Sequence, residues 1–166
     1  MPETKFDQPV YAPADPGPEH ALLKPFEGVF NAIVKLWLGP DESLEQPGVM
    51  TNTFQLAGFF LHQDYVGEQH GFAGKGYWGF NQTDRKYEGF WIDTASSTML
   101  HESGDVDESG TIWTMHSSAT NPETGDVMTK RSVIRLIDND HHIMELFLSV
   151  DGRPEFRNME IQYTRA

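Results

Sequence analysis

Two of the seven histidines are candidate ligands for a metal ion. If the turn at Asp107–Gly110 closes symmetrically, His101 lies directly opposite His116 on a neighbouring strand. Cβ atoms that face each other across an antiparallel pair are about 5 Å apart, so two imidazoles could share one metal ion. Two ligands leave the site incomplete, and a third would have to come from another strand. The alternative is a pair of exposed histidines on an acidic surface, since a register inferred from a turn slips easily.

The other histidines are expected to have no ligand role. His141 and His142 fall in a predicted turn, where exposure to solvent is expected. His62 is expected to face solvent, and His20 and His70 have the character of end-cap or loop residues.

Three charged residues lie inside otherwise apolar runs of the C-terminal part: Arg131, Glu145 and Glu160. If they point inward, they could orient the polar head of a ligand, and a buried carboxylate with a raised pKa could act as a general base. The turn at Asp151-Gly152 would place Asn158 opposite Glu145. The alternatives are ion pairs along the outer face, each contributing little to stability, or a structural pair that seals the floor of the fold.

The stretch from Gly74 to Asp93 is two aromatic-rich runs joined by a polar turn. Paired about that turn, Trp78 lies opposite Gly89, and Trp91 lies opposite Gly76. Two indoles that each face a glycine suit a curved sheet closing around an interior. Both tryptophans are therefore candidates to line a pocket, and the alternative is tight packing in a filled interior.

Four further residues complete the candidate pocket. Phe30 would help to enclose a ligand, and Gln63 and Tyr65 share one face of a strand, where a tyrosine hydroxyl could hold a polar group. Asp93 shares the face of Trp91, although an aspartate at a strand end also bonds to the amides of the following turn. The candidate ligand-binding residues are thus Phe30, Gln63, Tyr65, Trp78, Trp91, Asp93, Arg131, Glu145 and Glu160.

Strands must position these residues, because from Phe26 onward apolar residues recur with a period of mostly two. Ten strands are predicted, at 27–38, 49–56, 59–66, 72–81, 86–94, 97–107, 111–118, 127–138, 142–150 and 155–164. The segments between them are rich in Gly, Pro, Asn and Asp, which favour hairpin turns. The pattern predicts an all-β fold, an up-and-down antiparallel β-barrel of about ten strands.

Residues 19–166 are expected to form this barrel as one domain, and residues 1–18 an extended, proline-rich arm. A short helix at the start of the domain could plug one end of the barrel. In the first strand, Val29, Ile33 and Trp37 fall on the face expected to look outward. Either a homodimer interface or the arm would cover that apolar stripe.

The formal charge of −13 would repel nucleic-acid phosphates and anionic lipid, so partners of these kinds are not expected. The absence of cysteine excludes disulfides, thiolate metal sites and a cysteine nucleophile. No secretory signal opens the sequence and no apolar run reaches the length of a membrane span, so a cytoplasmic location is expected.

Four motifs carry a resemblance: His20-x-x-Leu23-x-x-Phe26-x-Gly28-x-Phe30, Trp37-x-Gly39-Pro40, Trp91-Ile92-Asp93 and Met159-Glu160-Ile161-x-Tyr163-Thr164-Arg165. In this order they resemble a bacterial family of unknown function that is assigned to the calycin-like (lipocalin-like) barrels. The family usually has Trp where Phe30 stands. The resemblance implies a barrel of about ten strands with a central pocket, and it implies no established reaction.

The architecture is also similar to nitrobindin-type barrels, which bind haem through one histidine near the C-terminal end. This sequence has no histidine after His142, and its last strand offers Met159 and Tyr163 instead. No cofactor is therefore predicted, and haem or a divalent metal is kept as an alternative.

The sequence thus predicts a barrel that binds a small hydrophobic or amphipathic molecule in an aromatic, mainly apolar pocket. One alternative is an enzyme on the same barrel that uses an inward carboxylate or histidine for proton transfer, isomerisation or hydrolysis. The others are a haem or metal protein and a barrel that serves mainly homo-oligomeric interaction.

Overall fold

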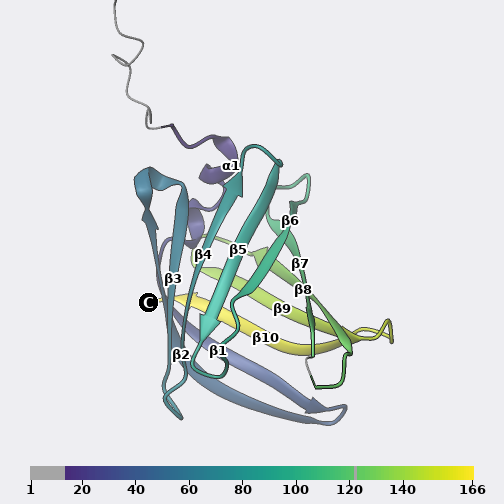
Figure 1. Ribbon diagram of the computed structural model, residues 1–166. Coiled ribbons are helices and arrows are strands. Elements are labelled where there is room, and N and C mark those ends of the chain that lie inside the picture. Colours follow the sequence, from purple (N-terminus) through teal and green to yellow (C-terminus); the bar gives the residue numbers. More distant parts are fainter. Residues whose placement is uncertain (1–13, 122) are drawn as a thin grey trace, which may run out of the picture.

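Alternating apolar residues from Gly28 onward build ten antiparallel strands in the computed structural model, which describes residues 14–121 and 123–166 (Figure 1). The strands are β1 (Gly28–Gly39), β2 (Glu42–Gln55), β3 (Phe60–Gly67), β4 (Ala73–Asn81), β5 (Lys86–Asp93), β6 (Leu100–Val106), β7 (Ile112–Thr120), β8 (Val127–Leu136), β9 (His141–Val150) and β10 (Phe156–Arg165). Each strand pairs with its neighbours in sequence, and β10 pairs with β1, so the sheet closes into an up-and-down barrel. The predicted all-β fold is confirmed.

All ten predicted strands are present, and the largest difference concerns β2. This strand begins at Glu42 rather than at residue 49, so its first half was missed. Pro47 and Gly48 are poor strand formers in that half. Pro47 is tolerated because β3 pairs with β2 only from Gly48 onward, which leaves the first half of β2 bonded to β1 alone.

A short helical segment closes one end of the barrel, at the top of Figure 1. It consists of α1 (Pro18–Ala21) and the 3₁₀ turn η1 (Lys24–Phe26), and it buries Leu23 and Phe26 against the strands. A second 3₁₀ turn, η2 (Leu56–Gly58), joins β2 to β3. The predicted helical plug is confirmed.

Side chains from the strands hold this plug by its backbone. Nδ2 of Asn52 donates a hydrogen bond to the carbonyl oxygen of Phe26 at 2.9 Å. The guanidinium of Arg165 donates to the carbonyl oxygens of Pro25 and Glu27, both at 2.9 Å. Because Arg165 ends β10, these bonds join the two ends of the domain at the plugged end of the barrel.

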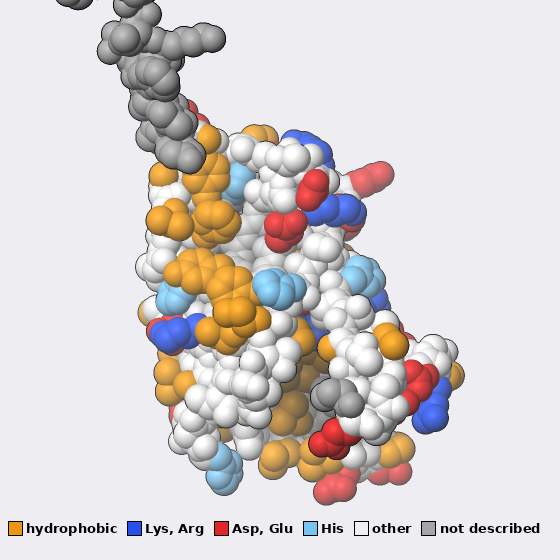
Figure 2. Space-filling model, viewed as in Figure 1, with side chains coloured by type: hydrophobic (Ala, Val, Ile, Leu, Met, Phe, Trp, Pro, Cys, Tyr) orange, Lys and Arg blue, Asp and Glu red, His pale blue; other side chains and the backbone are white. Residues whose placement is uncertain are grey.

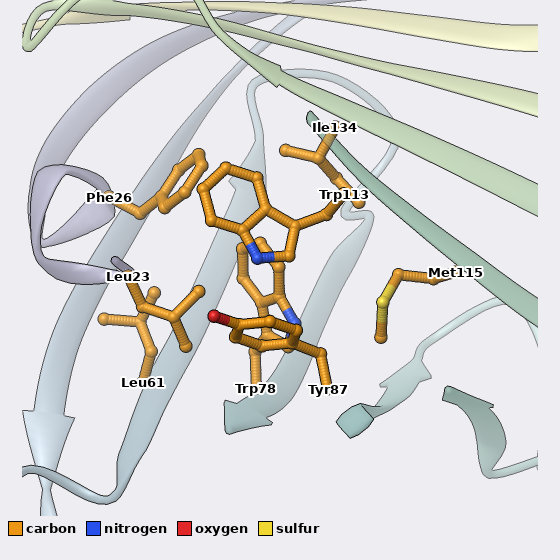
Figure 3. Close-up of a cluster of buried hydrophobic side chains, with 8 residues drawn as sticks. All are labelled: Leu23, Phe26, Leu61, Trp78, Tyr87, Trp113, Met115 and Ile134. Carbon is orange, nitrogen blue, oxygen red and sulfur yellow. The ribbon is translucent and has the colours of Figure 1, made fainter. Parts of the chain in front are cut away.

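The core has two clusters of buried side chains. The first, which we call the plug cluster, consists of Leu23, Phe26, Leu61, Trp78, Tyr87, Trp113, Met115 and Ile134. Figure 3 shows Leu23 and Phe26 reaching from the helical segment toward the rings of Trp78 and Trp113. The second cluster lies on β1, β2, β3 and β10 and consists of Phe30, Ala32, Val34, Met50, Tyr65, Ile161 and Tyr163.

The predicted apolar stripe of Val29, Ile33 and Trp37 lies on the outward face of β1, between the polar Asn31 and Lys35. Val29 and Ile33 are 43% and 46% exposed, and the ring of Trp37 lies under the guanidinium of Arg157, 4.2 Å from its carbon. Of the predicted arm, residues 1–13 lie outside the described residues. No helix in the described part of the chain is both long and apolar enough to span a membrane.

Candidate functional site

The hairpin of β4 and β5 has the predicted register, with the pairs Gly74–Asp93, Gly76–Trp91 and Trp78–Gly89. The ring of Trp91 lies over Gly74 and Gly76 of β4, and a Cβ on Gly74 would overlap it. Nε1 of Trp91 donates to Oδ2 of Asp93 at 3.0 Å, and the other oxygen of Asp93 accepts from the amide of Ala95 at 2.8 Å. Asp93 therefore orients the indole and caps the turn that follows its strand.

The space beside Trp78 is filled by the protein itself. Its ring centroid is 5.2 Å from that of Phe26 and 5.6 Å from that of Trp113, within the plug cluster. Phe30 is fully buried as well. Of the two tryptophans predicted to face a ligand, Trp91 lies outside this cluster and is partly exposed.

Tyr65 and Gln63 point inward from β3, as expected. Tyr65 is buried over Gly48, where a Cβ would overlap its phenol ring, and burial raises the pKa of its hydroxyl. Gln63 is partly exposed and its side-chain oxygen lies next to Gly76. Tyr65 is thus a packing residue, whereas Gln63 retains contact with solvent.

The wall of the barrel is incomplete along the seam between β6 and β7. These strands pair over four positions, from Ser103–His116 to Val106–Trp113. Beyond that point, within the described chain, residues 100–102 of β6 pair only with β5, and residues 117–120 of β7 pair only with β8. Figure 1 shows the two strands diverging toward the end of the barrel away from α1. We call the resulting gap the β6–β7 opening.

An ion pair faces the interior at this opening. Nζ of Lys130, on β8, lies 3.2 Å from Oε2 of Glu102, on β6. The buried hydroxyl of Ser132 donates to the same carboxylate oxygen at 3.2 Å. The Lys130 and Glu102 side chains are only 15% and 23% exposed. A charged and hydrogen-bonded group therefore lies just inside the point where β6 and β7 separate.

Both charges can be reached from outside the barrel. Glu102 and Gly89, which point inward, line a depression of about 300 Å³ on the outer surface. Lys130 and Ser117, which also point inward, line a second depression of about 380 Å³. The two depressions thus lie on either side of the part of the seam where β6 and β7 no longer pair.

Apolar side chains also face the interior of the barrel outside the two buried clusters. Leu36, Trp91, Met144 and Met159 pack against the second core cluster but remain partly exposed. Figure 2 shows a hollow in the lower part of this face, between the ends of β5 and of the β7–β8 pair, with hydrophobic side chains deep inside it. The half of the barrel away from the plug is thus less completely filled than the half beneath it.

Residues 15–165 match the family described as "Protein of unknown function (DUF1579)". The chain belongs to this family. The DUF1579 chain is also similar to the solved structure titled "Crystal Structure of Rv2717c from M. tuberculosis", with 16% sequence identity and a TM-score of 0.62. The similarity covers 92% of this chain and 99% of that chain, and at such low identity it bears on the fold alone. None of the curated proteins compared matches the chain.

The charged residues predicted to point into the DUF1579 barrel lie on its outer face. Arg131 forms two hydrogen bonds with Glu155, at 3.0 and 2.6 Å. Glu145 pairs with Arg135 and Arg157, and Glu160 also pairs with Arg157. The inward orientation was therefore wrong, and the alternative of outer-face ion pairs is confirmed.

The predicted register of the β9–β10 hairpin was also wrong by two residues, a shift that leaves every side chain on its original face. Glu160, rather than Asn158, pairs with Glu145, because residues 151–155 lie outside the strands and the register shifts between Arg157 and Met159. Glu145 and Glu160 lie side by side, and Arg157 bridges their carboxylates. Arg157 thereby offsets the repulsion between the two carboxylates on the outer surface. These side chains do not converge on a pocket.

The predicted pairing of His101 with His116 was also wrong by two residues. His116 pairs with Ser103, and His101 pairs with Phe90, with both histidines on the outer face. The turn is longer than a symmetric Asp107–Gly110 closure, because the Asp107 carboxylate accepts bonds from amides as far as Ile112. In the described ranges, no group of three or more His, Cys, Asp or Glu residues could hold a metal ion.

His142 is buried inside the barrel, which corrects the expectation that it is exposed in a turn. Its ring stacks on that of Tyr163, with centroids 4.3 Å apart, and the rings of Phe26 and Phe30 lie at 5.0 and 4.7 Å. Burial, assisted by the positive charge of Arg165, lowers the pKa of the imidazole to about 3. His142 is therefore neutral at physiological pH.

His20 is an end-cap residue, as expected, and it is also buried. Its Nδ1 accepts a hydrogen bond from the amide of Gly17 at 3.1 Å, and its ring meets those of Phe59 and Phe80 edge to face. His20 and His142 are thus both enclosed by packed rings.

Sequence reasoning missed Glu102, Lys130 and Ser132 as a site. One signal was present, because Glu102 lies opposite Gly89, on the face of β5 that carries Trp91. Lys130 and Arg131 are adjacent in sequence, so one of them must point inward, and the sequence did not indicate which.

Proposed function

We propose that this protein binds a small amphipathic molecule in the half of the barrel away from the plug, with access through the β6–β7 opening. One observation carries the proposal: the Glu102–Lys130 ion pair faces an apolar interior at the only part of the β6–β7 seam in the described chain where the two strands no longer pair. The partly exposed apolar side chains of the interior would hold the body of the ligand, and the charges would orient its polar end.

Stability alone is a weak reason to keep an ion pair in this position. Removing two charges from water is costly, and apolar residues of similar size often stabilise such a site equally well. Glu102 and Lys130 come from strands that are not neighbours, so their attraction spans the opening without replacing any backbone pairing. Their position suits a polar contact with a molecule that passes through the opening.

The apolar half of the proposed site consists of side chains that remain partly exposed. Trp91 is fixed by Asp93 and by the glycines beneath its ring, so it offers a rigid aromatic surface. Met144 and Met159 are flexible and can adapt to the shape of an apolar ligand. A fixed ring opposite adaptable side chains suits a binder of several related compounds.

The test is a titration with phenylnaphthylamine, an uncharged apolar fluorophore whose emission rises in apolar sites. We expect saturable binding and a rise in the temperature of unfolding, because a ligand that binds only the folded state stabilises it. Replacing Met159 with Trp should fill the site and weaken binding at least about tenfold. Gln162→Trp, at an exposed position on the same strand, is the matched control and should leave binding unchanged. The proposal would be contradicted if the unaltered protein showed no saturable binding of phenylnaphthylamine. It would also be contradicted if Met159→Trp and Gln162→Trp bound the fluorophore with equal affinity.

A further inference from the structure

We infer that the polar group of the ligand is uncharged and both donates and accepts hydrogen bonds, as an alcohol does, and that a carboxylate is disfavoured. This inference rests on the proposed function, because it concerns the same site. It follows from the balance of charge and of hydrogen-bonding capacity around Glu102 and Lys130.

The site is electrically balanced before any ligand arrives. The carboxylate of Glu102 faces the ammonium of Lys130 at 3.2 Å, and the third polar group of the cluster, the Ser132 hydroxyl, is neutral. A ligand anion could bind Lys130 only by competing with Glu102, and it would then lie beside that carboxylate. Like charges a few ångströms apart in a poorly solvated site repel strongly.

The field of the whole protein acts in the same direction. The formal charge is −13, so an anion approaching the barrel meets a negative potential. Glu88 lines the outer depression next to Glu102, which adds negative charge at that side of the opening. Arg131, which lines the depression next to Lys130, is paired with Glu155. The opening therefore does not offer an anion an unopposed positive charge.

A hydroxyl fits the hydrogen-bonding capacity that the cluster retains. An ammonium carries three N–H donors, and a carboxylate has about four lone-pair positions. One position on Glu102 accepts the bond from Ser132, and Lys130 lies 3.2 Å from the same oxygen as an ion pair. A hydroxyl can accept a bond from Lys130 and donate one to Glu102, so it extends the existing network without adding charge.

The experiment compares decanol with decanoate at neutral pH, each as a competitor of phenylnaphthylamine. The two probes share one alkyl chain and differ in the charge of the head. With the unaltered protein we expect decanol to bind at least about tenfold more tightly than decanoate.

Variants that remove a charge but keep a side chain of similar shape test whether Glu102 and Lys130 determine the preference. Glu102→Gln leaves Lys130 unopposed, so the preference should shift toward decanoate by about tenfold or more. Lys130→Met leaves Glu102 unopposed, so the preference for decanol should increase. Glu145→Gln, which removes a carboxylate on the outer face, is the control and should leave the preference unchanged. Circular dichroism and the temperature of unfolding establish that each variant is folded.

The outcomes separate the two proposals. If the unaltered protein binds decanoate as tightly as decanol, or if Glu102→Gln shifts the preference no more than Glu145→Gln, the inference is overturned while the proposed function stands. If neither probe displaces phenylnaphthylamine and neither shifts the temperature of unfolding, the proposed function fails and the inference fails with it. A preference for decanol that falls in Glu102→Gln and rises in Lys130→Met supports both the inference and the proposed function.

Discussion

The imidazole of His142 stacks on the phenol ring of Tyr163, with the ring centroids 4.3 Å apart and the planes 17° from parallel. The two residues face each other across β9 and β10, and both are at most 5% exposed. Burial lowers the pKa of the imidazole to about 3 and raises the pKa of the tyrosine hydroxyl beyond its usual range. Both groups are therefore kept uncharged in the interior.

This burial predicts a loss of stability in acid. The unfolded chain takes up a proton on His142 near pH 6.5, whereas the folded protein does so only near pH 3. Stability is fully present above about pH 6.5, and it falls as the pH drops toward 3, with a slope of up to about 1.4 kcal/mol per pH unit from this group. Urea unfolding at a series of pH values measures the slope. His142→Phe should make the slope shallower, because it removes the buried imidazole. Parallel pH profiles for the protein and His142→Phe would contradict this account.

Arg165 is predicted to hold the plug in place. Arg165→Met removes its hydrogen bonds to the carbonyl oxygens of Pro25 and Glu27, and leaves those acceptors partly buried. We expect the free energy of unfolding to fall by about 2–3 kcal/mol, measured by urea unfolding. Arg153→Met, in the exposed turn between β9 and β10, is the matched control and should cost less than about 0.5 kcal/mol. Equal losses in the two variants would argue that Arg165 has no special role.

Gly74 is predicted to be required by the ring of Trp91. Gly74→Ala places a methyl group where the indole lies, so the ring must move or the strand must shift. A cost of about 1–3 kcal/mol in the free energy of unfolding is expected, together with a change in the near-ultraviolet circular dichroism of the tryptophans. Gly39→Ala is the control, because no atom lies within 4 Å of the added methyl group. An unchanged near-ultraviolet spectrum in Gly74→Ala would disprove the contact.

Arg131 is predicted to be dispensable for binding. Arg131→Gln breaks the pair with Glu155 on the outer face, and such a partly exposed pair contributes about 0–1 kcal/mol to stability. The affinity for phenylnaphthylamine should be unchanged within a factor of about two. A large loss of affinity would instead place Arg131 in the binding site.

The fold was predictable because its periodicity and turns are strong signals. The β4–β5 register was also predictable, since a short polar turn joins the strands and glycines lie opposite Trp78 and Trp91. The registers predicted for the β6–β7 and β9–β10 hairpins were wrong, because the turns contain extra residues. Side chains such as Asp107 bond to the backbone and hold these residues in the turn. The alternation of apolar residues does not show how many residues a turn contains. Each predicted register was therefore wrong by two positions, and a shift of two leaves each side chain on the same face.

The site was less predictable because both faces of the C-terminal strands look apolar. Val133 and Ile134 are adjacent in β8 and both are buried, although they point to opposite faces. Long arginine side chains can cover apolar residues on an outer face, and Arg131 and Arg135 flank Val133 on the same face. Alternation therefore could not tell that Lys130 points inward and Arg131 outward. The three-residue cluster also depends on strands that are distant in sequence.

The plug and the unpaired part of the β6–β7 seam lie toward opposite ends of the barrel, so different contacts control two different properties. The plug end carries the packed rings and the Arg165 bonds, so it governs how firmly the chain stays folded. At the other end β6 and β7 no longer pair, so under the proposed function this end would set how quickly a ligand enters and leaves. Under that proposal, substitutions along the seam would change residence time without altering thermal tolerance, and substitutions at the plug would change thermal tolerance without altering residence time.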